Sequence, residues 1–198
     1  RATEGVWLVP IGPLTNVALA LRAAPDLGSR IAGISLMGGG TFGNVSAAAE
    51  FNLWADPEAA DIVFRYGGKL MMSGLDVTHQ FQATPERLTA IRAIPGQLPN
   101  VLADLLAFYS KSYINHHVNM TGAAVHDPCA VLSLTHPQFF TITPHRVDIE
   151  LRGEHTRGMT MIDRRQYKTP TTPNCDVVWN VDAAPAFDVL IEAVNHFA

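Results

Sequence analysis

The side chains best suited to chemistry lie in three short segments, each placed where a strand is expected to end. The segments are Ile11 to Asn16, Met37 to Asn52 and His126 to Pro128. In a sheet of parallel strands the carboxyl ends meet at one edge, and ligands bind beyond that edge. We therefore expect the three segments to face one ligand.

The second segment is the richest in polar groups. Gly38 to Gly40 follow an expected strand, and Asn44, Glu50 and Asn52 come soon after among small residues. Two amides and a carboxylate suit a polyol, because each sugar hydroxyl is both a donor and an acceptor of hydrogen bonds. The alternative is an ordinary glycine loop with solvated polar side chains, since short glycine motifs often occur by chance.

The third segment has the sequence His126-Asp127-Pro128. Pro128 favours the first position of a helix and disfavours a helical conformation for the residue before it, so Asp127 is expected to be extended at a strand-to-helix corner. Asp127 suits either an N-cap or a hard oxygen ligand for Ca²⁺ or Mg²⁺. His126 suits either a structural hydrogen bond or the donation of a proton.

Alternating strands and helices position these segments. Asp56-Pro57 and Thr84-Pro85 are typical helix starts, with a capping side chain before a first-turn proline. A longer helix with an apolar face from Val101 to Tyr109 is expected after Asn100, and a closing helix with a buried stripe ending at Phe197 after Asp182. The predicted strands are 6–11, 31–37, 69–75 and 176–181, with 147–151 and 159–162 paired antiparallel.

This pattern predicts an α/β fold with a mostly parallel central sheet and helices on both faces, similar to a Rossmann fold. A chain of 198 residues with 47% hydrophobic content can bury one sizeable core, so one domain spanning residues 1–198 is expected.

The composition also limits the partners and the compartment. A net charge of −4 without a basic block argues against nucleic acid, and no apolar run reaches the length of a membrane span. Cys129 and Cys175 stand far apart and outside any paired motif, which favours the reducing cytoplasm.

Five motifs, in order along the chain, closely resemble the inosine-uridine-preferring nucleoside hydrolases. They are residues 9–16 (VPIGPLTN), 37–39 (MGG), 49–60 (AEFNLWADPEAA), 74–78 (GLDVT) and 125–128 (VHDP). The resemblance implies hydrolysis of the N-glycosidic bond of purine or pyrimidine ribonucleosides to free base and ribose. It also implies a homodimer or homotetramer and one Ca²⁺ that binds the attacking water.

The resemblance further implies a role for each candidate residue. Asn44, Glu50 and Asn52 match positions that hold the ribose hydroxyls, Met37 lies against the sugar, and His126 assists the departing base. For the metal, the resemblance implies the carboxylate of Asp127 and the backbone carbonyl of Ile11. These roles suit a transition state that resembles an oxocarbenium ion, which needs stabilisation of positive charge and protonation of the leaving group.

The sequence departs from the family in one respect: it lacks the Asp-rich D-x-D-x-x-x-D-D motif that supplies most of the metal ligands and the base for water. Asp127 and one carbonyl fall short of the about six to eight oxygen ligands that Ca²⁺ prefers. We therefore expect an incomplete calcium site and a C-terminal portion of a hydrolase, without the strands that the family places before Val6. The base-facing segment, Asn115 to Gly122 with His116, His117 and Asn119, matches the family poorly.

Two interpretations from different classes remain open. The first is a nucleoside hydrolase, active as the intact protein. The second is a truncated, inactive paralogue that binds ribose or a nucleoside, or that keeps only the fold. A dinucleotide-binding dehydrogenase is excluded, because no G-x-G-x-x-G motif opens a helix in this sequence.

Overall fold

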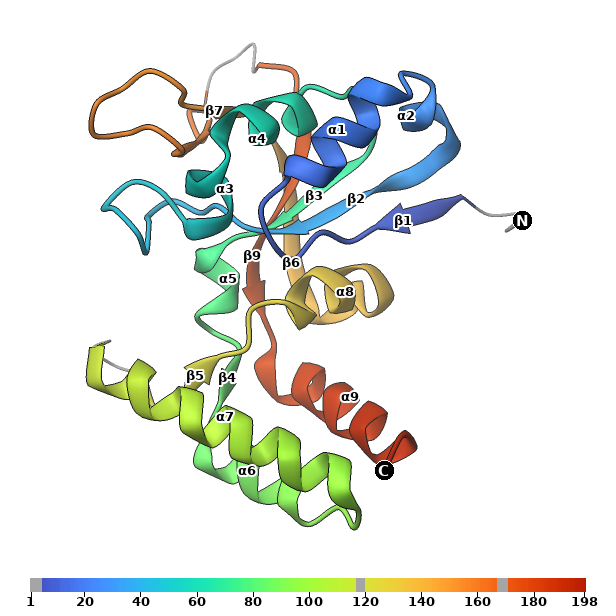
Figure 1. Ribbon diagram of the computed structural model, residues 1–198, viewed down its shortest axis with the longest axis vertical. Coiled ribbons are helices and arrows are strands. Elements are labelled where there is room, and N and C mark those ends of the chain that lie inside the picture. The colour runs from blue at the N-terminus through green and yellow to red at the C-terminus, as the bar shows by residue number, and fades with distance from the viewer. Residues whose placement is uncertain (1–4, 117–119, 167–170) are drawn as a thin grey trace.

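A five-stranded sheet forms the centre of the protein (Figure 1). The computed structural model describes residues 5–116, 120–166 and 171–198. In the sheet order β1-β2-β3-β9-β6, the first four strands are parallel and β6 runs antiparallel to β9. The mostly parallel sheet predicted above is confirmed. The strands are β1 (Val6–Leu8), β2 (Ile31–Met37), β3 (Leu70–Ser73), β9 (Cys175–Val181) and β6 (Phe140–His145).

Helices cover both faces of this sheet. Ile34 and Leu36 of β2 are buried in a cluster with residues of α1 (Thr15–Ala23) and α4 (Pro57–Phe64). The alternate residue Ser35 points to the other face, where its hydroxyl donates to the carbonyl of Ala130 in α8 (Pro128–Thr135) at 2.7 Å. Because successive strand residues face opposite ways, a strand that is buried on both faces, as β2 is from Gly33 to Met37, suits a sheet covered on both sides.

Both predicted helix starts with a capping side chain and a proline are present. The Asp56 carboxylate accepts from the Ala59 amide at 3.0 Å at the start of α4. The Thr84 hydroxyl accepts from the Arg87 amide at 3.4 Å at the start of α6 (Pro85–Arg92). These caps satisfy amides that have no partner within their helices.

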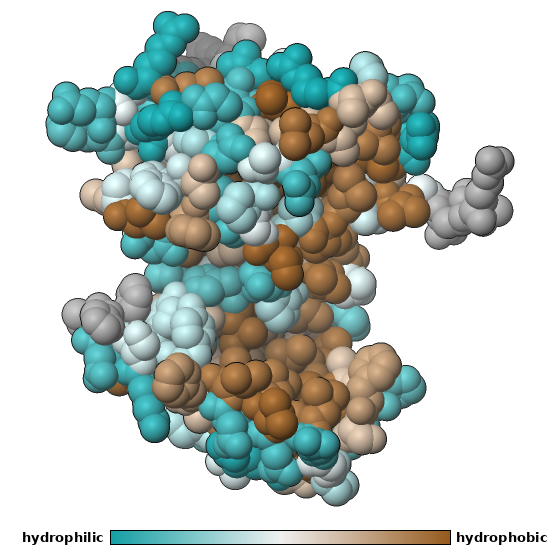
Figure 2. All heavy atoms as spheres, in the orientation of Figure 1, coloured by the Kyte–Doolittle hydropathy of each residue, from teal (hydrophilic) through white to brown (hydrophobic). Residues whose placement is uncertain are grey.

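A second apolar cluster lies beyond the carboxyl ends of the strands, between α6, α7 (Gln97–His116) and α9 (Ala183–His196). The apolar face predicted for α7 was partly wrong, because Val101 and Leu105 are exposed while Ala103 is buried. Phe197 was also predicted to be buried and is 73% exposed, since α9 ends before it. Figure 2 shows apolar side chains at the surface over this lower half of the molecule.

The remaining elements are short. The predicted antiparallel pair is confirmed as β7 and β8, whereas no strand was predicted where β6 lies. No helix in the described ranges is long and apolar enough to cross a membrane. The short elements are α2 (Leu27–Arg30), α3 (Phe51–Ala55), α5 (Leu75–Thr78), β4 (Gln82–Ala83), β5 (Ala123–Ala124), β7 (Val147–Ile149), β8 (Thr160–Ile162) and the 3₁₀ helix Pro137–Phe139.

Candidate functional site

One hollow at the carboxyl ends of β1 and β2 brings together every candidate residue predicted from the sequence. Its volume is about 280 Å³, near the lower limit of roughly 300 Å³ for small-molecule sites. The three segments that carry these residues are far apart in the chain, and the parallel sheet places them side by side. The hollow is lined by Ile11, Met37, Asn44, Glu50, Phe51, Asn52, Tyr109, Tyr113, His126 and Asp127.

Glu50 organises one wall of this hollow. Its side chain is only 3% exposed, and it caps the N-terminus of α3. One carboxylate oxygen accepts from the Asn52 amide at 2.9 Å, and the other accepts from the amides of Gly39 at 2.9 Å and Leu53 at 3.3 Å. Burial raises the pKa of Glu50 despite these hydrogen bonds, and the nearby Asp127 carboxylate adds to the rise.

The glycine loop lets the backbone approach this carboxylate. Gly39 has a φ of +72°, and a Cβ at this position would lie 2.7 Å from Cγ2 of Thr160. Only glycine adopts this conformation readily in such a confined place. The glycines therefore close the loop around Glu50, which favours the functional interpretation over an ordinary glycine turn.

The two amide side chains present complementary groups. The Oδ1 atom of Asn44 accepts from the Phe51 amide at 2.9 Å, so its Nδ2 group is the part left to donate. The Nδ2 group of Asn52 donates to the Met37 carbonyl at 3.1 Å, so its Oδ1 atom is the part left to accept. Asn44 is exposed, and Asn52 and Met37 are buried. A donor and an acceptor beside one hollow match the dual character of a hydroxyl group.

His126 is held between two hydroxyl groups. Its Nε2 atom lies 2.6 Å from the Tyr113 hydroxyl, and its Nδ1 atom lies 2.7 Å from Oγ1 of Thr78. Tyr113 comes from α7 and Thr78 from the last position of α5. Burial raises the pKa of Tyr113, so its hydroxyl stays protonated. The ring is thus fixed at both nitrogens beside the hollow.

The expectation that Asp127 is extended was wrong. It has helical angles, with φ −66° and ψ −38°. The carbonyls of His126 and Asp127 accept from the amides of Cys129 and Ala130, at 3.2 and 3.1 Å. These hydrogen bonds of a helical turn offset the steric cost that Pro128 imposes on the residue before it.

The carboxylate of Asp127 does not cap the helix that it precedes. Partial burial raises its pKa, and it lies close enough to Glu50 to disfavour a second negative charge there. Two carboxylates beside one hollow, neither of them paired with a cation among the described residues, create a negative potential there.

The donors beside this hollow do not complete a calcium site. Among residues 5–116, 120–166 and 171–198, no three acidic, histidine or cysteine side chains gather as metal ligands would. Asp127 and the Ile11 carbonyl are two oxygen donors, against the about six to eight that Ca²⁺ prefers. The described residues therefore do not fit the ion by themselves.

Sequence reasoning missed four residues of this region, one of which, Phe51, appeared only as part of the motif at 49–60. Tyr109 and Tyr113 lie four positions apart on α7, and both line the hollow. Their spacing places them on one helix face, but Tyr109 was predicted only as part of an apolar stripe. Thr78 lies within the motif at 74–78, where nothing in the sequence marks it as a partner of His126.

The predicted base-facing segment is only partly described. His117 and Asn119 lie outside the described residues, as does the side chain of His116. The described neighbours are aromatic: the Tyr109 and Tyr113 ring centroids are 5.2 Å apart, and those of Tyr113 and His126 are 6.0 Å apart.

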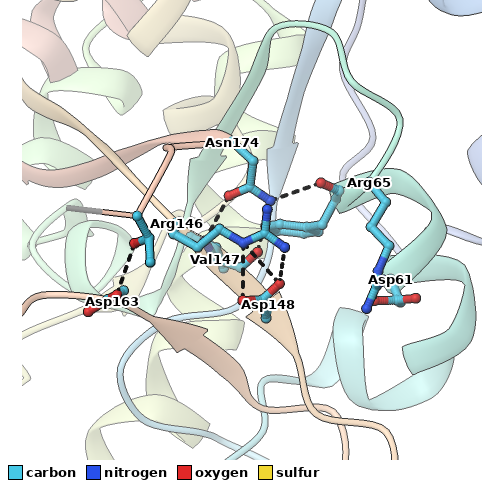
Figure 3. A network of polar contacts seen from close by, with 9 residues as sticks. Asp61, Arg65, Arg146, Val147, Asp148, Asp163 and Asn174 are labelled. Carbon is cyan, nitrogen blue, oxygen red and sulfur yellow. Dashed lines mark hydrogen bonds and ion pairs between the residues drawn. The ribbon is translucent and has the colours of Figure 1, made fainter. Parts of the chain in front are cut away.

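Two larger hollows lie elsewhere, one of about 540 Å³ at the start of β3 and β9 and one of about 590 Å³ beside β7 and β8. Arg146 lines both of them, and Figure 3 shows it paired with Asp148. Arg65 is paired with Asp61 at 2.7 Å in the same view. These neutralised pairs, together with the Asn174 side chain that joins neighbouring loops, indicate a structural network.

Curated relatives match nearly the whole chain. It is 44% identical over 194 residues to the pyrimidine-specific ribonucleoside hydrolase RihA of Shewanella woodyi, covering 98% of this chain and 62% of that protein. It is 41% identical over 199 residues to the RihA of Escherichia fergusonii, covering 100% of this chain and 64% of that protein. The chain therefore spans less than two thirds of the length of these relatives.

Solved structures share the fold. A purine-preferring ribonucleoside hydrolase from Gardnerella vaginalis matches with a TM-score of 0.86 and 36% identity, over 97% of this chain and 62% of that one. An inosine-guanosine nucleoside hydrolase matches with a TM-score of 0.85 and 29% identity, over 98% of this chain and 63% of that one. The family model described as inosine-uridine preferring nucleoside hydrolase matches residues 1–188. With that match and these relatives, the chain belongs to the inosine-uridine preferring nucleoside hydrolase family.

Proposed function

We propose that the protein hydrolyses the N-glycosidic bond of ribonucleosides and releases free base and ribose. The observation that carries this proposal is the convergence of seven predicted residues on one hollow: Ile11, Met37, Asn44, Glu50, Asn52, His126 and Asp127. Amides and a carboxylate on one wall suit a sugar, and a hydrogen-bonded histidine on another suits a leaving group. The names of the relatives support the same reaction.

The ribose is bound by the wall that Glu50 organises. Asn44 donates to one hydroxyl, Asn52 accepts from another, and Met37 packs against the sugar ring. Oε1 of Glu50 accepts only the Asn52 amide among the described contacts, so it keeps a lone pair for a ribose hydroxyl. The burial of Glu50 and Asn52 supports this assignment, because hydrogen bonds at buried groups compete less with water.

His126 assists the departure of the base. When the C–N bond breaks, its electron pair moves to the base, and a proton from the imidazolium forms the new N–H bond. Water adds to the sugar carbon and loses a proton, which balances the reaction. The carboxylates of Glu50 and Asp127 favour the positive charge that develops on the sugar.

The Asp127 carboxylate and the Ile11 carbonyl are this chain's proposed contribution to a calcium site. Bound Ca²⁺ would lower the pKa of a water molecule and make it a better nucleophile. Since two donors do not fill the coordination shell, no step above depends on the ion. A homodimer or homotetramer, a cytoplasmic location and a single hydrolase domain also stay part of the proposal. The two buried free thiols suit a reducing compartment.

Pyrimidine ribonucleosides are the favoured substrates. The relatives named pyrimidine-specific are 44% and 41% identical to this chain, whereas the solved structures named for purine substrates are 36% and 29% identical. Uridine is therefore expected to be cleaved faster than inosine.

The test compares the complete gene product with its His126→Ala variant, in buffers with and without added calcium. Base release from uridine and inosine is measured, with Thr84→Ala as a control variant that changes a helix cap away from the hollow. We expect kcat to fall about a hundred-fold or more in His126→Ala and to stay unchanged in Thr84→Ala. No release of base by the calcium-supplied wild type would reject the proposal.

A nucleoside-binding paralogue without catalysis is the second candidate, and the incomplete metal donor set favours it. Calorimetry with ribose and uridine distinguishes the two. Binding without base release supports the paralogue, whereas base release excludes it.

A further inference from the structure

Thr78 contacts His126 from the side that faces away from the hollow. It does not line the hollow, and its side chain is fully buried. We propose that Thr78 is a positioning residue, which accepts a hydrogen bond from Nδ1 of His126 and so holds Nε2 toward the Tyr113 hydroxyl at the edge of the hollow. This inference rests on the proposed function, because it assigns a task to the same histidine.

The position of the Thr78 hydroxyl is fixed by the short helix α5. The Thr78 amide donates to the Gly74 carbonyl at 3.1 Å, and the Leu75 amide donates to the Gly39 carbonyl at 2.9 Å. Oδ2 of Asp76 accepts from the Thr41 amide at 2.8 Å. A helix held at two points against the glycine loop, through Leu75 and Asp76, cannot move away from His126 without breaking these hydrogen bonds.

The protonation of the two ring nitrogens of His126 determines which hydrogen bond the Thr78 hydroxyl makes. A neutral imidazole carries one N–H group and an imidazolium carries two. A protonated phenol at Nε2, as in Tyr113, can donate to that nitrogen in the neutral ring, which leaves the hydrogen on Nδ1. Oγ1 of Thr78, 2.7 Å away, is placed to accept it. The same oxygen accepts from Nδ1 when the ring is charged.

The direction of proton transfer follows from this arrangement. Tyr113 lines the hollow and Thr78 does not, so the Nε2 side is the one that meets the substrate. In the reaction the N–H bond at Nε2 breaks and its proton passes to the Tyr113 hydroxyl, 2.6 Å away, while the proton of that hydroxyl forms the N–H bond on the base. The ring then keeps its hydrogen on Nδ1, still bonded to Thr78, and returns to the neutral state described above.

A merely structural role makes a different prediction from a positioning role. Thr78→Val keeps the shape of the side chain and removes the acceptor, whereas Thr78→Ser keeps the hydroxyl and removes a methyl group. If Thr78 only fills space, Ser is the more harmful change. If it positions His126, Val is the more harmful change and Ser restores function.

The first experiment measures kinetics on the complete gene product with two substrates. Uridine needs protonation of its base, and a riboside with a nitrophenolate leaving group does not. We expect Thr78→Val to lower kcat for uridine about ten-fold, the effect of losing one hydrogen bond of roughly 1.4 kcal/mol. We expect little change in KM or with the nitrophenyl riboside, and near wild-type rates in Thr78→Ser. Equal losses on both substrates would overturn the inference.

The second experiment does not depend on activity. The ¹⁵N shifts of the His126 ring, recorded at a pH where the ring is neutral, report which nitrogen carries the hydrogen. We expect the hydrogen on Nδ1 in the wild type and in Thr78→Ser, and on Nε2 in Thr78→Val. An unchanged pattern in Thr78→Val would refute the positioning role, even if the wild type hydrolyses no nucleoside and the proposed function itself has failed.

Discussion

Replacement of Glu50 by alanine is the sharpest test of how the wall of the hollow around Glu50 is built. The carboxylate accepts from three backbone amides, two of them at 2.9 Å and one at 3.3 Å. Loss of an N-cap costs about 1 kcal/mol, and a buried amide left without a partner, as at Gly39, costs about 1 to 3 kcal/mol. Relief of a buried charge offsets part of this loss. We expect Glu50→Ala to lower the free energy of unfolding by about 2 to 3 kcal/mol.

The assay is urea unfolding at pH 7, followed by circular dichroism. Thr84→Ala is the matched control, because Thr84 caps α6 through one long hydrogen bond of 3.4 Å. We expect it to cost about 0.5 kcal/mol. Equal losses of stability in the two variants would show that the Glu50 carboxylate does not hold the glycine loop in place.

Two further predictions concern the same loop. Gly39→Ala should lower the free energy of unfolding by about 3 kcal/mol, because the position has a φ of +72° and the new Cβ would lie 2.7 Å from Cγ2 of Thr160. Gly12→Ala meets no atom within 4 Å and should be almost neutral in the same urea titration; similar losses in both variants would contradict the role of the confined turn. Glu50→Gln should change the pH dependence of stability, because the folded pKa of Glu50 is raised above its ordinary 4.5. A raised folded pKa gives stability that is present below the unfolded pKa and is lost as pH rises through the folded value. The wild type should therefore lose stability relative to Glu50→Gln as pH rises from about 4 to 7, and an opposite slope in unfolding at several pH values would refute this sign.

The sequence was informative where one local signal decides the structure. Asp56-Pro57 and Thr84-Pro85 mark helix starts through a cap and a fixed φ, and both helices begin as predicted. The apolar segment Ile31–Met37 is a strand with the predicted bounds. The grouping of the candidate residues in one hollow also follows from sequence, because parallel strands bring their carboxyl-end loops together.

Features set by distant contacts were not predictable in the same way. The exposed face of α7 depends on which helices pack against it, and an apolar pattern alone does not say which side they cover. The strand β6 was missed although Phe140 to Thr143 alternate between apolar and polar residues, because Pro144 interrupts the pattern, and an edge strand tolerates a proline. The contact between Thr78 and His126 joins residues 48 positions apart and has no local signal.

The four residues of α5 join two parts of the site. The helix contacts the glycine loop through Asp76 and Thr41, and it contacts His126 through Thr78. A ligand that holds the glycine loop in place therefore makes local opening of α5 less frequent. Less frequent opening of α5 in turn reduces the motion of His126. Backbone amides of α5 should exchange with deuterium more slowly when ribose alone is bound, before any base is present. Binding of the sugar would then hold His126 in position before the base is bound.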